Sequence, residues 1–216
     1  TTSGTYTVQV TNAAGCQSVA SAGKTVTVNS LPGKPTITAG GPTTFCSGGS
    51  VTLTSSAGTT YLWSSGATTA SISPTTSGTY TVRVTNAAGC QSVASDSVTV
   101  TVNTLPTISL GTVSNPTSCT VDNGSVTIVG SGNGTLTWSG AANGSQVVSN
   151  FPDTVFNLGD GNYSIYFTDG NGCVSSALNV TLTTPSAPPA PTITAGGPTS
   201  FCPGGSVTLT DRKSVV

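Results

Sequence analysis

The sequence predicts an all-β protein built from several small β-sandwich modules in tandem. Three observations carry this prediction. Val, Ile and Thr alternate with other residues in short runs, which gives each run two distinct strand faces. Gly-, Asn- and Pro-rich turns separate these runs, and no segment has the 3.6-residue period of a helix. Long stretches also occur twice, which indicates that whole modules are repeated.

Two repeats define the period of these modules. The stretch SGTYTVQVTNAAGCQSVAS at 3–21 returns at 77–95, 74 residues later, and only Gln9 changes, to Arg83. The stretch PTITAGGPTTFCSGGSVTLT at 35–54 returns at 191–210 with two changes. The first repeat is the back half of a module and the second is its front half. A period near 74 residues is too long for a solenoid repeat and long enough for a self-contained domain.

The repeats predict four modules, two of them truncated, and a tail. The expected ranges are the back half of one module at 1–30, a complete module at 35–104, a different complete module at 106–184, the front half of another at 191–210, and a non-native tail at 211–216. Because the chain opens inside a module, we expect it to be part of a longer protein. Pro-rich joints between the modules should keep them extended, like beads on a string.

The complete first-type module predicts six or seven short strands, as a sandwich requires. Its run TYTVRVT places Tyr80, Val82 and Val84 on an inner face and Arg83 on the outer face. The NAAG turn that follows this run is a hairpin signal. Because Gln9 and Arg83 both face solvent, their exchange should cost less than about 0.5 kcal/mol. The near-identity of the two copies therefore indicates the duplication of a scaffold.

Two aromatic residues carry a first resemblance. Trp63 in YLWSSG lies upstream of Tyr80 in SGTYTVRV, which resembles the immunoglobulin-like pattern of a core Trp on the third strand and a Tyr that begins the sixth. Val82 stands where antibody-type domains have their second Cys. The whole unit, from PTITAGG to NAAGC, is similar to the PKD-like modules of large Bacteroidota surface proteins.

The module at 106–184 resembles the SprB-type repeat of gliding-motility adhesins from the same phylum. The matching residues are Cys119, NGSVTI, LTWSG with Trp138, and LGDGNYSIYFTDGNGC with Tyr163 and Cys173. The run SQVVSNFPDTVFN at 145–157 departs from the usual repeat, which leaves the strand layout open there. Together the resemblances imply an extracellular cell-surface protein, exported by the type IX secretion pathway. We expect Trp63, Tyr80, Trp138 and Tyr163 to lie in the module cores.

The six cysteines follow one rhythm along the chain. A head cysteine precedes a GGS or NGS strand start, and a tail cysteine follows an AAG or GNG turn. The head cysteines are Cys46, Cys119 and Cys202, and the tail cysteines are Cys16, Cys90 and Cys173. Two cysteines in each small secreted module predict a disulfide, whereas the absence of His and of CxxC argues against a metal site.

Two disulfide pairings remain open at this point. The favoured pairs lie within modules, Cys46–Cys90 and Cys119–Cys173, because modules that shuffle freely should carry their own bond. The alternative is Cys46–Cys173, between neighbouring modules. It arises because the head and tail cysteines of one immunoglobulin-like sandwich would lie at opposite poles, whereas a bond needs Cα atoms within about 7 Å.

No catalytic, cofactor or metal site is expected. Charged residues make up 5% of the chain, and there is no Glu and no His to work with the six acids: Asp96, Asp122, Asp153, Asp160, Asp169 and Asp211. The stretches GDGN and TDGNG each offer one carboxylate, too few for calcium, and are typical of turns. We therefore expect a protein that is not an enzyme and that holds no cofactor.

Few surface features point to a partner. Trp63 and Trp138 could stack on sugars, but their equivalent places in the two modules favour core packing. Ser97 in DSV and Thr154 in DTV match a short signal for O-glycosylation in Bacteroidota. The sequence contains no apolar run of about 18 residues, so no membrane span is expected in this segment. Arg212 and Lys213 belong to the expected tail, so these two basic residues are not evidence of a nucleic-acid partner, and none is expected.

These observations predict a structural and adhesive repeat segment of a large secreted cell-surface protein. The modules would project a binding region toward an unknown surface or polysaccharide ligand, with neighbouring modules of the same chain as the other partners. The alternative is a set of spacer or glycan-binding modules in an extracellular multidomain polysaccharide-degrading enzyme, whose catalytic domain would lie elsewhere.

Overall fold

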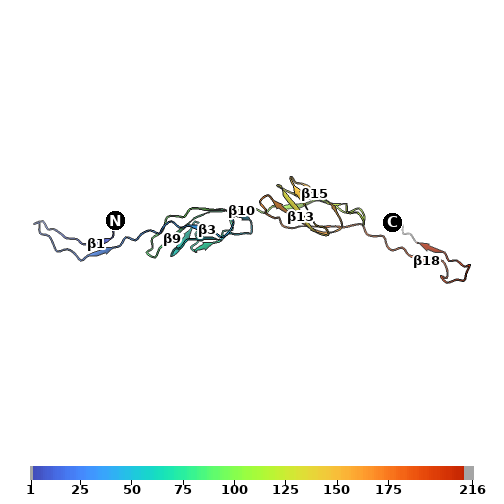
Figure 1. Cartoon of the computed structure of the whole chain (residues 1–216), viewed down its shortest axis with the longest axis horizontal. Coiled ribbons are helices and arrows are strands. Elements are labelled where there is room, and N and C mark those ends of the chain that lie inside the picture. The colour runs from blue at the N-terminus through green and yellow to red at the C-terminus, as the bar shows by residue number, and fades with distance from the viewer. Residues whose placement is uncertain (1, 212–216) are drawn as a thin grey trace. The chain divides into compact units, whose positions relative to one another are not determined.

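The computed structural model describes residues 2–211, and over this range every regular element is a β-strand (Figure 1). The predicted all-β fold class is confirmed. In the described residues no helix is long and apolar enough to cross a membrane.

The chain divides into two compact units. The first consists of Thr1–Leu105 with Asn171–Cys173, and the second of Pro106–Gly170 with Val174–Val216. Each unit contains its own cluster of buried apolar side chains. The division after Leu105 falls between the two modules expected at 35–104 and 106–184, and the exact module boundaries stay a prediction.

The first unit begins with a hairpin and continues into a sandwich. The hairpin pairs β1 (Gly4–Tyr6) with β2 (Lys24–Val26) in antiparallel fashion. The strands that follow are β3 (Ile37–Ala39), β4 (Thr44–Cys46), β5 (Leu53–Ser55), β6 (Thr60–Trp63), β7 (Ser71–Ile72), β8 (Gly78–Tyr80), β9 (Val82–Thr85) and β10 (Val98–Asn103). One sheet has the order β3-β5-β7, a second has the order β4-β10-β8, and β6 pairs with β9.

Only Thr81 separates β8 from β9, so these two strands form one interrupted strand. It pairs with β10 through β8 and with β6 through β9. Strand β4 runs parallel to β10, and their register places Cys46 beside Asn103. The head cysteine therefore lies where the chain leaves this module.

The core of the first unit follows the predicted alternation. Val82 is 1% exposed and packs with Val51, Leu53, Trp63 and Val100. Val84 is buried as well, and Arg83 between them is exposed. The inner and outer faces of this strand are therefore as the sequence predicts.

The second unit contains a seven-stranded sandwich. Its strands are β11 (Ile108–Ser114), β12 (Gly124–Gly130), β13 (Gly134–Gly140), β14 (Gly144–Val148), β15 (Asp153–Leu158), β16 (Gly161–Asp169) and β17 (Leu178–Leu182). One sheet has the order β11-β12-β15 and the other β14-β13-β16-β17. Inward side chains of both sheets form one core, which includes Leu136, Val155, Ile165 and Phe167. Two packed antiparallel sheets of this size are typical of the immunoglobulin-like architecture.

The segment at 145–157, whose layout the sequence left open, supplies strands to both sheets. Its first part belongs to β14 in the four-stranded sheet, and its second part belongs to β15 in the three-stranded sheet. The chain therefore changes sheets between Val148 and Asp153.

The last described element is a hairpin of β18 (Ile193–Ala195) and β19 (Leu209–Asp211). Asp211, the first residue of the expected tail, pairs with Ile193. The rest of that tail, 212–216 with Arg212 and Lys213, lies outside the described residues.

Candidate functional site

A tyrosine brace recurs in three places along the chain. In each copy the Tyr hydroxyl donates a hydrogen bond to the backbone carbonyl four residues upstream. The donors and acceptors are Tyr6 and Thr2 at 2.9 Å, Tyr80 and Thr76 at 3.1 Å, and Tyr163 and Gly159 at 3.1 Å. This arrangement is the tyrosine corner of immunoglobulin-like sandwiches. The repeated residue therefore serves the scaffold.

The four predicted core aromatics are buried to different extents. Trp63 and Tyr163 are each 2% exposed, and Trp63 Nε1 donates a hydrogen bond to the Thr69 carbonyl at 2.8 Å. Tyr80 and Trp138 are half-buried and pack against the two cores. Trp63 has no exposed face on which a sugar could stack.

Trp138 lies across from a glycine on the neighbouring strand. In the pairing of β13 with β14, Trp138 is opposite Gly144. A Cβ at Gly144 would approach the indole ring to 2.3 Å, so the ring occupies the space of the missing side chain. This position, like that of Trp63, serves packing.

The one position that differs between the copies at 3–21 and 77–95 makes the same hydrogen bond in both. Gln9 Nε2 donates to the Ser18 carbonyl at 3.1 Å. Arg83 Nη1 donates to the Ser92 carbonyl, also at 3.1 Å, and Ser92 is the repeat equivalent of Ser18. The substitution therefore preserves the contact as well as the exposed location.

We expect Arg83→Gln to change the free energy of unfolding by less than about 0.5 kcal/mol, because the Gln at the equivalent position makes the same bond. Arg83→Ala removes the donor and should cost about 0.5–1.5 kcal/mol. Urea unfolding of the three proteins tests this. Equal losses for both variants would contradict the equivalence of Gln and Arg.

The disulfide of the structure is the alternative pair, and the favoured pairing is not formed. Cys46 and Cys173 are bonded with a Cα–Cα distance of 5.6 Å. Cys90 and Cys119, the partners expected for them, carry free thiols, as do Cys16 and Cys202. Neither Cys46–Cys90 nor Cys119–Cys173 is therefore present.

Strand register explains why a bond within the module fails. Tyr80 on β8 is level with Val98, where β10 begins, and the two strands run in opposite directions. Cys46 lies beside Asn103, at the end of β10. Cys90 follows β9, which continues from β8 past the level at which β10 begins, so Cys90 lies beyond the opposite end of the β8–β10 pair. About ten strand residues, or roughly 33 Å, separate the two levels. A disulfide needs Cα atoms within about 7 Å.

The acidic residues are dispersed. Asp96 forms an ion pair with Lys34, in which the Asp96 side chain is 93% exposed and that of Lys34 is 47% exposed. Asp153 accepts hydrogen bonds from Gln146 Nε2 at 2.9 Å and from the Thr154 backbone at 2.8 Å. Over residues 2–211 no three acids or cysteines lie close enough together to hold one metal ion.

The two Asp-Gly stretches form turns. Gly161 in GDGN has φ 127° and Gly172 in TDGNG has φ 79°, backbone conformations that favour glycine. The glycines are explained by these turns.

Tyr163 has a perturbed ionisation. Burial raises the pKa of its phenol above the usual value of 10.0, and the nearby carboxylates of Asp122 and Asp160 raise it further. The hydrogen bond to the Gly159 carbonyl holds the neutral phenol in place. The hydroxyl is thus kept protonated for its structural bond.

We expect the second unit to lose stability above pH 10. The unfolded chain releases the Tyr163 proton near pH 10, and the folded chain releases it only at higher pH. The stabilisation is therefore complete below pH 10 and declines by at most about 1.4 kcal/mol per pH unit above it. Urea unfolding at pH 8, 9.5 and 11 measures the decline. It should be smaller in Tyr163→Phe, and an unchanged slope in that variant would exclude Tyr163 as the cause.

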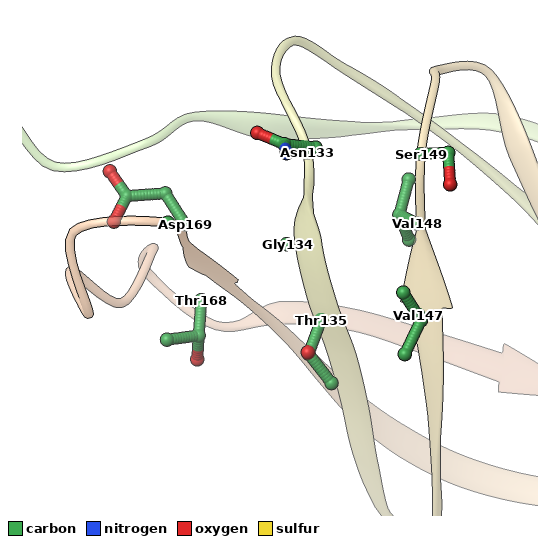
Figure 2. Close-up of a pocket in the computed structure, with 9 residues that line it drawn as sticks. Asn133, Gly134, Thr135, Val147, Val148, Ser149, Thr168 and Asp169 are labelled. Carbon is green, nitrogen blue, oxygen red and sulfur yellow. The ribbon is translucent and has the colours of Figure 1, made fainter.

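The second unit carries an open depression at one end of its four-stranded sheet (Figure 2). Its volume is about 390 Å³. Figure 2 shows Gly134 and Thr135 on β13, between Val147 and Val148 on β14 and Thr168 and Asp169 on β16. Asn133, Ser149 and Gly170 complete the lining. Hydroxyl, amide and carboxylate groups beside an exposed Val147 suit a hydroxyl-rich ligand.

Sequence reasoning missed this depression. Strands β13, β14 and β16 contribute to it, and β15 separates the last of them from the other two in the sequence. Asn, Thr and Ser also occur throughout the chain. No local pattern distinguished the lining residues from other surface residues.

The two candidate glycosylation residues differ in access. Ser97 is exposed. Thr154 is half-buried on β15, and its hydroxyl shares a 2.9 Å hydrogen bond with the Thr127 hydroxyl across the sheet. Of the two, Ser97 has the accessible hydroxyl, and its modification stays a prediction.

Comparisons with known proteins found similarity only among solved structures. No family model matches the chain, and no curated protein matches it. The human OSCAR ligand-binding domain is 17% identical, with 71% of this chain and 100% of that chain covered and a TM-score of 0.29. The FN1–FN3 domains of chicken CNTN1 are 13% identical, with 82% and 77% covered and a TM-score of 0.30. The fold assignment rests on the strand pairing described above.

Proposed function

We propose that this chain is a structural and adhesive repeat segment of a large secreted cell-surface protein. One observation carries the proposal: the features that recur from module to module are scaffold contacts. The tyrosine brace occurs three times, and the only residue that changes in the 19-residue repeat keeps its hydrogen bond. Duplication of this kind extends a stalk.

The disulfide supports an extracellular location. Disulfides persist in oxidising compartments and are rare in the cytosol. The Cys46–Cys173 bond joins residues 127 positions apart, so it holds a long stretch of chain against extension. A covalent tie of this kind suits a protein that transmits force between a cell and a surface.

The sequence resemblance supports the finer part of the proposal. The similarity to PKD-like modules and to the SprB-type repeat points to a gliding-motility adhesin of the Bacteroidota, exported by the type IX pathway. In this proposal the ligand is an extracellular surface or a polysaccharide, and the modules carry the binding region away from the cell.

A bead-retention assay tests adhesion. The oxidised full chain is coupled to beads, and their retention under flow is counted on glass, agarose, cellulose and chitin. Beads that carry an unrelated β-sandwich protein serve as the control. We expect several-fold higher retention on at least one surface. Equal loss from all surfaces would contradict adhesion, and release of reducing sugars from any polysaccharide by the chain would contradict a non-enzymatic role.

The depression in the second unit favours a second candidate, glycan binding within a polysaccharide-degrading enzyme. Its lining groups can donate to and accept from sugar hydroxyls. A glycan array probed with the full chain tests this. Thr135→Arg should abolish binding at the depression, and Thr99→Arg, on an exposed strand position of the first unit, should not. Binding that survives Thr135→Arg would place the glycan elsewhere.

A further inference from the structure

In this structure the head cysteine of one module bonds to the tail cysteine of the next module, and this rule is consistent with the state of all six cysteines. Cys46 is the head cysteine of the module at 35–104, and Cys173 is the tail cysteine of the module that follows it. No other consecutive pair of modules has both of these cysteines within the sequence. Cys16, Cys90, Cys119 and Cys202 carry free thiols, and none of them has a counterpart of this kind in the sequence.

The surroundings of Cys90 show a place for such a partner. The Cys90 thiol lies 3.9 Å from the Asn29 carbonyl oxygen, at the end of the segment 1–30. Asn29 is the repeat equivalent of Asn103, because VTVN ends at both positions, 74 residues apart. Asn103 is the residue beside which Cys46 lies on β4, and its carbonyl accepts a 2.8 Å bond from the Ser47 backbone. A head cysteine in the module that includes Asn29 would therefore lie next to the Cys90 thiol.

The side chain of Asn86 holds Cys90 at this place. Its Oδ1 accepts hydrogen bonds from the backbone of Ala88 at 3.1 Å and of Cys90 at 2.9 Å. Its Nδ2 donates to the Ser30 carbonyl at 2.9 Å. One side chain thus orients the cysteine and ties its turn to the preceding segment.

We propose that Cys90 is a covalent bonding site for the head cysteine of the preceding module, and that consecutive modules are joined in this way along the repeat. Cys119 is the corresponding site for the tail cysteine of the following module. It is exposed, and its thiol lies 3.1 Å from the Pro185 carbonyl, just past β17 where the chain leaves its module. This assignment holds whether or not the chain binds a surface.

The bond forms by thiol–disulfide exchange with a disulfide oxidant such as oxidised glutathione. One thiolate attacks the oxidant and releases the first glutathione thiol. The second thiolate attacks the resulting mixed disulfide and releases the second. Two protein thiols become one disulfide, two electrons pass to the oxidant, and its two halves leave as thiols.

A chain extended by a second copy of its own residues tests the proposal. Residues 75–80 are identical to residues 1–6, so a copy of 35–74 placed ahead of Thr1 completes the first module with native sequence. The extended chain has seven cysteines. After oxidation with glutathione we expect two disulfides and three free thiols by intact mass and thiol titration, against one disulfide and four free thiols in the original chain.

Cys90 and Cys16 form a matched pair for this experiment, because both end the same NAAGC turn. In the extended chain Cys90→Ser should remove one disulfide, whereas Cys16→Ser should leave both. The proposal is overturned if Cys16→Ser removes the second disulfide and Cys90→Ser does not, which would show a bond within the module. It is also overturned if Cys46–Cys173 forms and the added cysteine stays free.

Discussion

Reduction of the Cys46–Cys173 bond should lengthen the fully stretched chain by roughly 420–460 Å. The two cysteines are 127 positions apart, so the bond excludes the loop between them from extension, and each residue spans at most 3.3–3.6 Å. Single-molecule pulling between the two ends, with and without a reducing agent, measures the difference in contour length. This is the largest mechanical effect that the structure predicts.

Single cysteine variants identify the bond responsible. Cys46→Ser in oxidising buffer should reproduce the reduced length, and Cys90→Ser should keep the oxidised length. An increment of only roughly 150 Å, the length of the 44 residues from Cys46 to Cys90, would show that the bond lies within the module.

Val82→Asp should unfold the module at 35–104, whereas Val8→Asp should have almost no effect. The two valines occupy equivalent positions in the copies at 3–21 and 77–95, but Val82 is 1% exposed and Val8 is 65% exposed. An Asp at the buried position has no cation in the surrounding cluster and should cost about 3–5 kcal/mol. A module of about 70 residues has about 3.5–10 kcal/mol of stability, so this loss removes a large part of it.

Calorimetry with Trp63 fluorescence measures this pair of variants. In Val82→Asp the transition that exposes Trp63 should shift down by 10 °C or more, since about 1 kcal/mol corresponds to 4–8 °C in a domain of this size. The transition of the second unit should remain. In Val8→Asp both transitions should stay within about 0.5 kcal/mol of the parent. Similar shifts for the two variants would show that the residue environments do not differ as described.

The strand faces of this protein could be predicted from the sequence because they depend on local alternation. Val82, Val84 and Arg83 lie on the faces that the run TYTVRVT indicates. The turn after Asn86 has Gly89 at φ 80°, as a Gly-ended turn requires. Side-chain direction along a strand has a period of two residues, so near neighbours are sufficient to determine it.

The disulfide partner and the depression depended on tertiary structure. The sequence alone determined an all-β chain of repeated scaffold modules with regularly placed cysteines. Two thiols can bond only where the pairing of strands far apart in the sequence brings the two cysteines close together. This pairing bonds Cys46 to Cys173 and places Cys90 beside Asn29. Burial is decided in the same way: Val8 and Val82 have the same neighbours in sequence, and only the strands packed over Val82 exclude water from it.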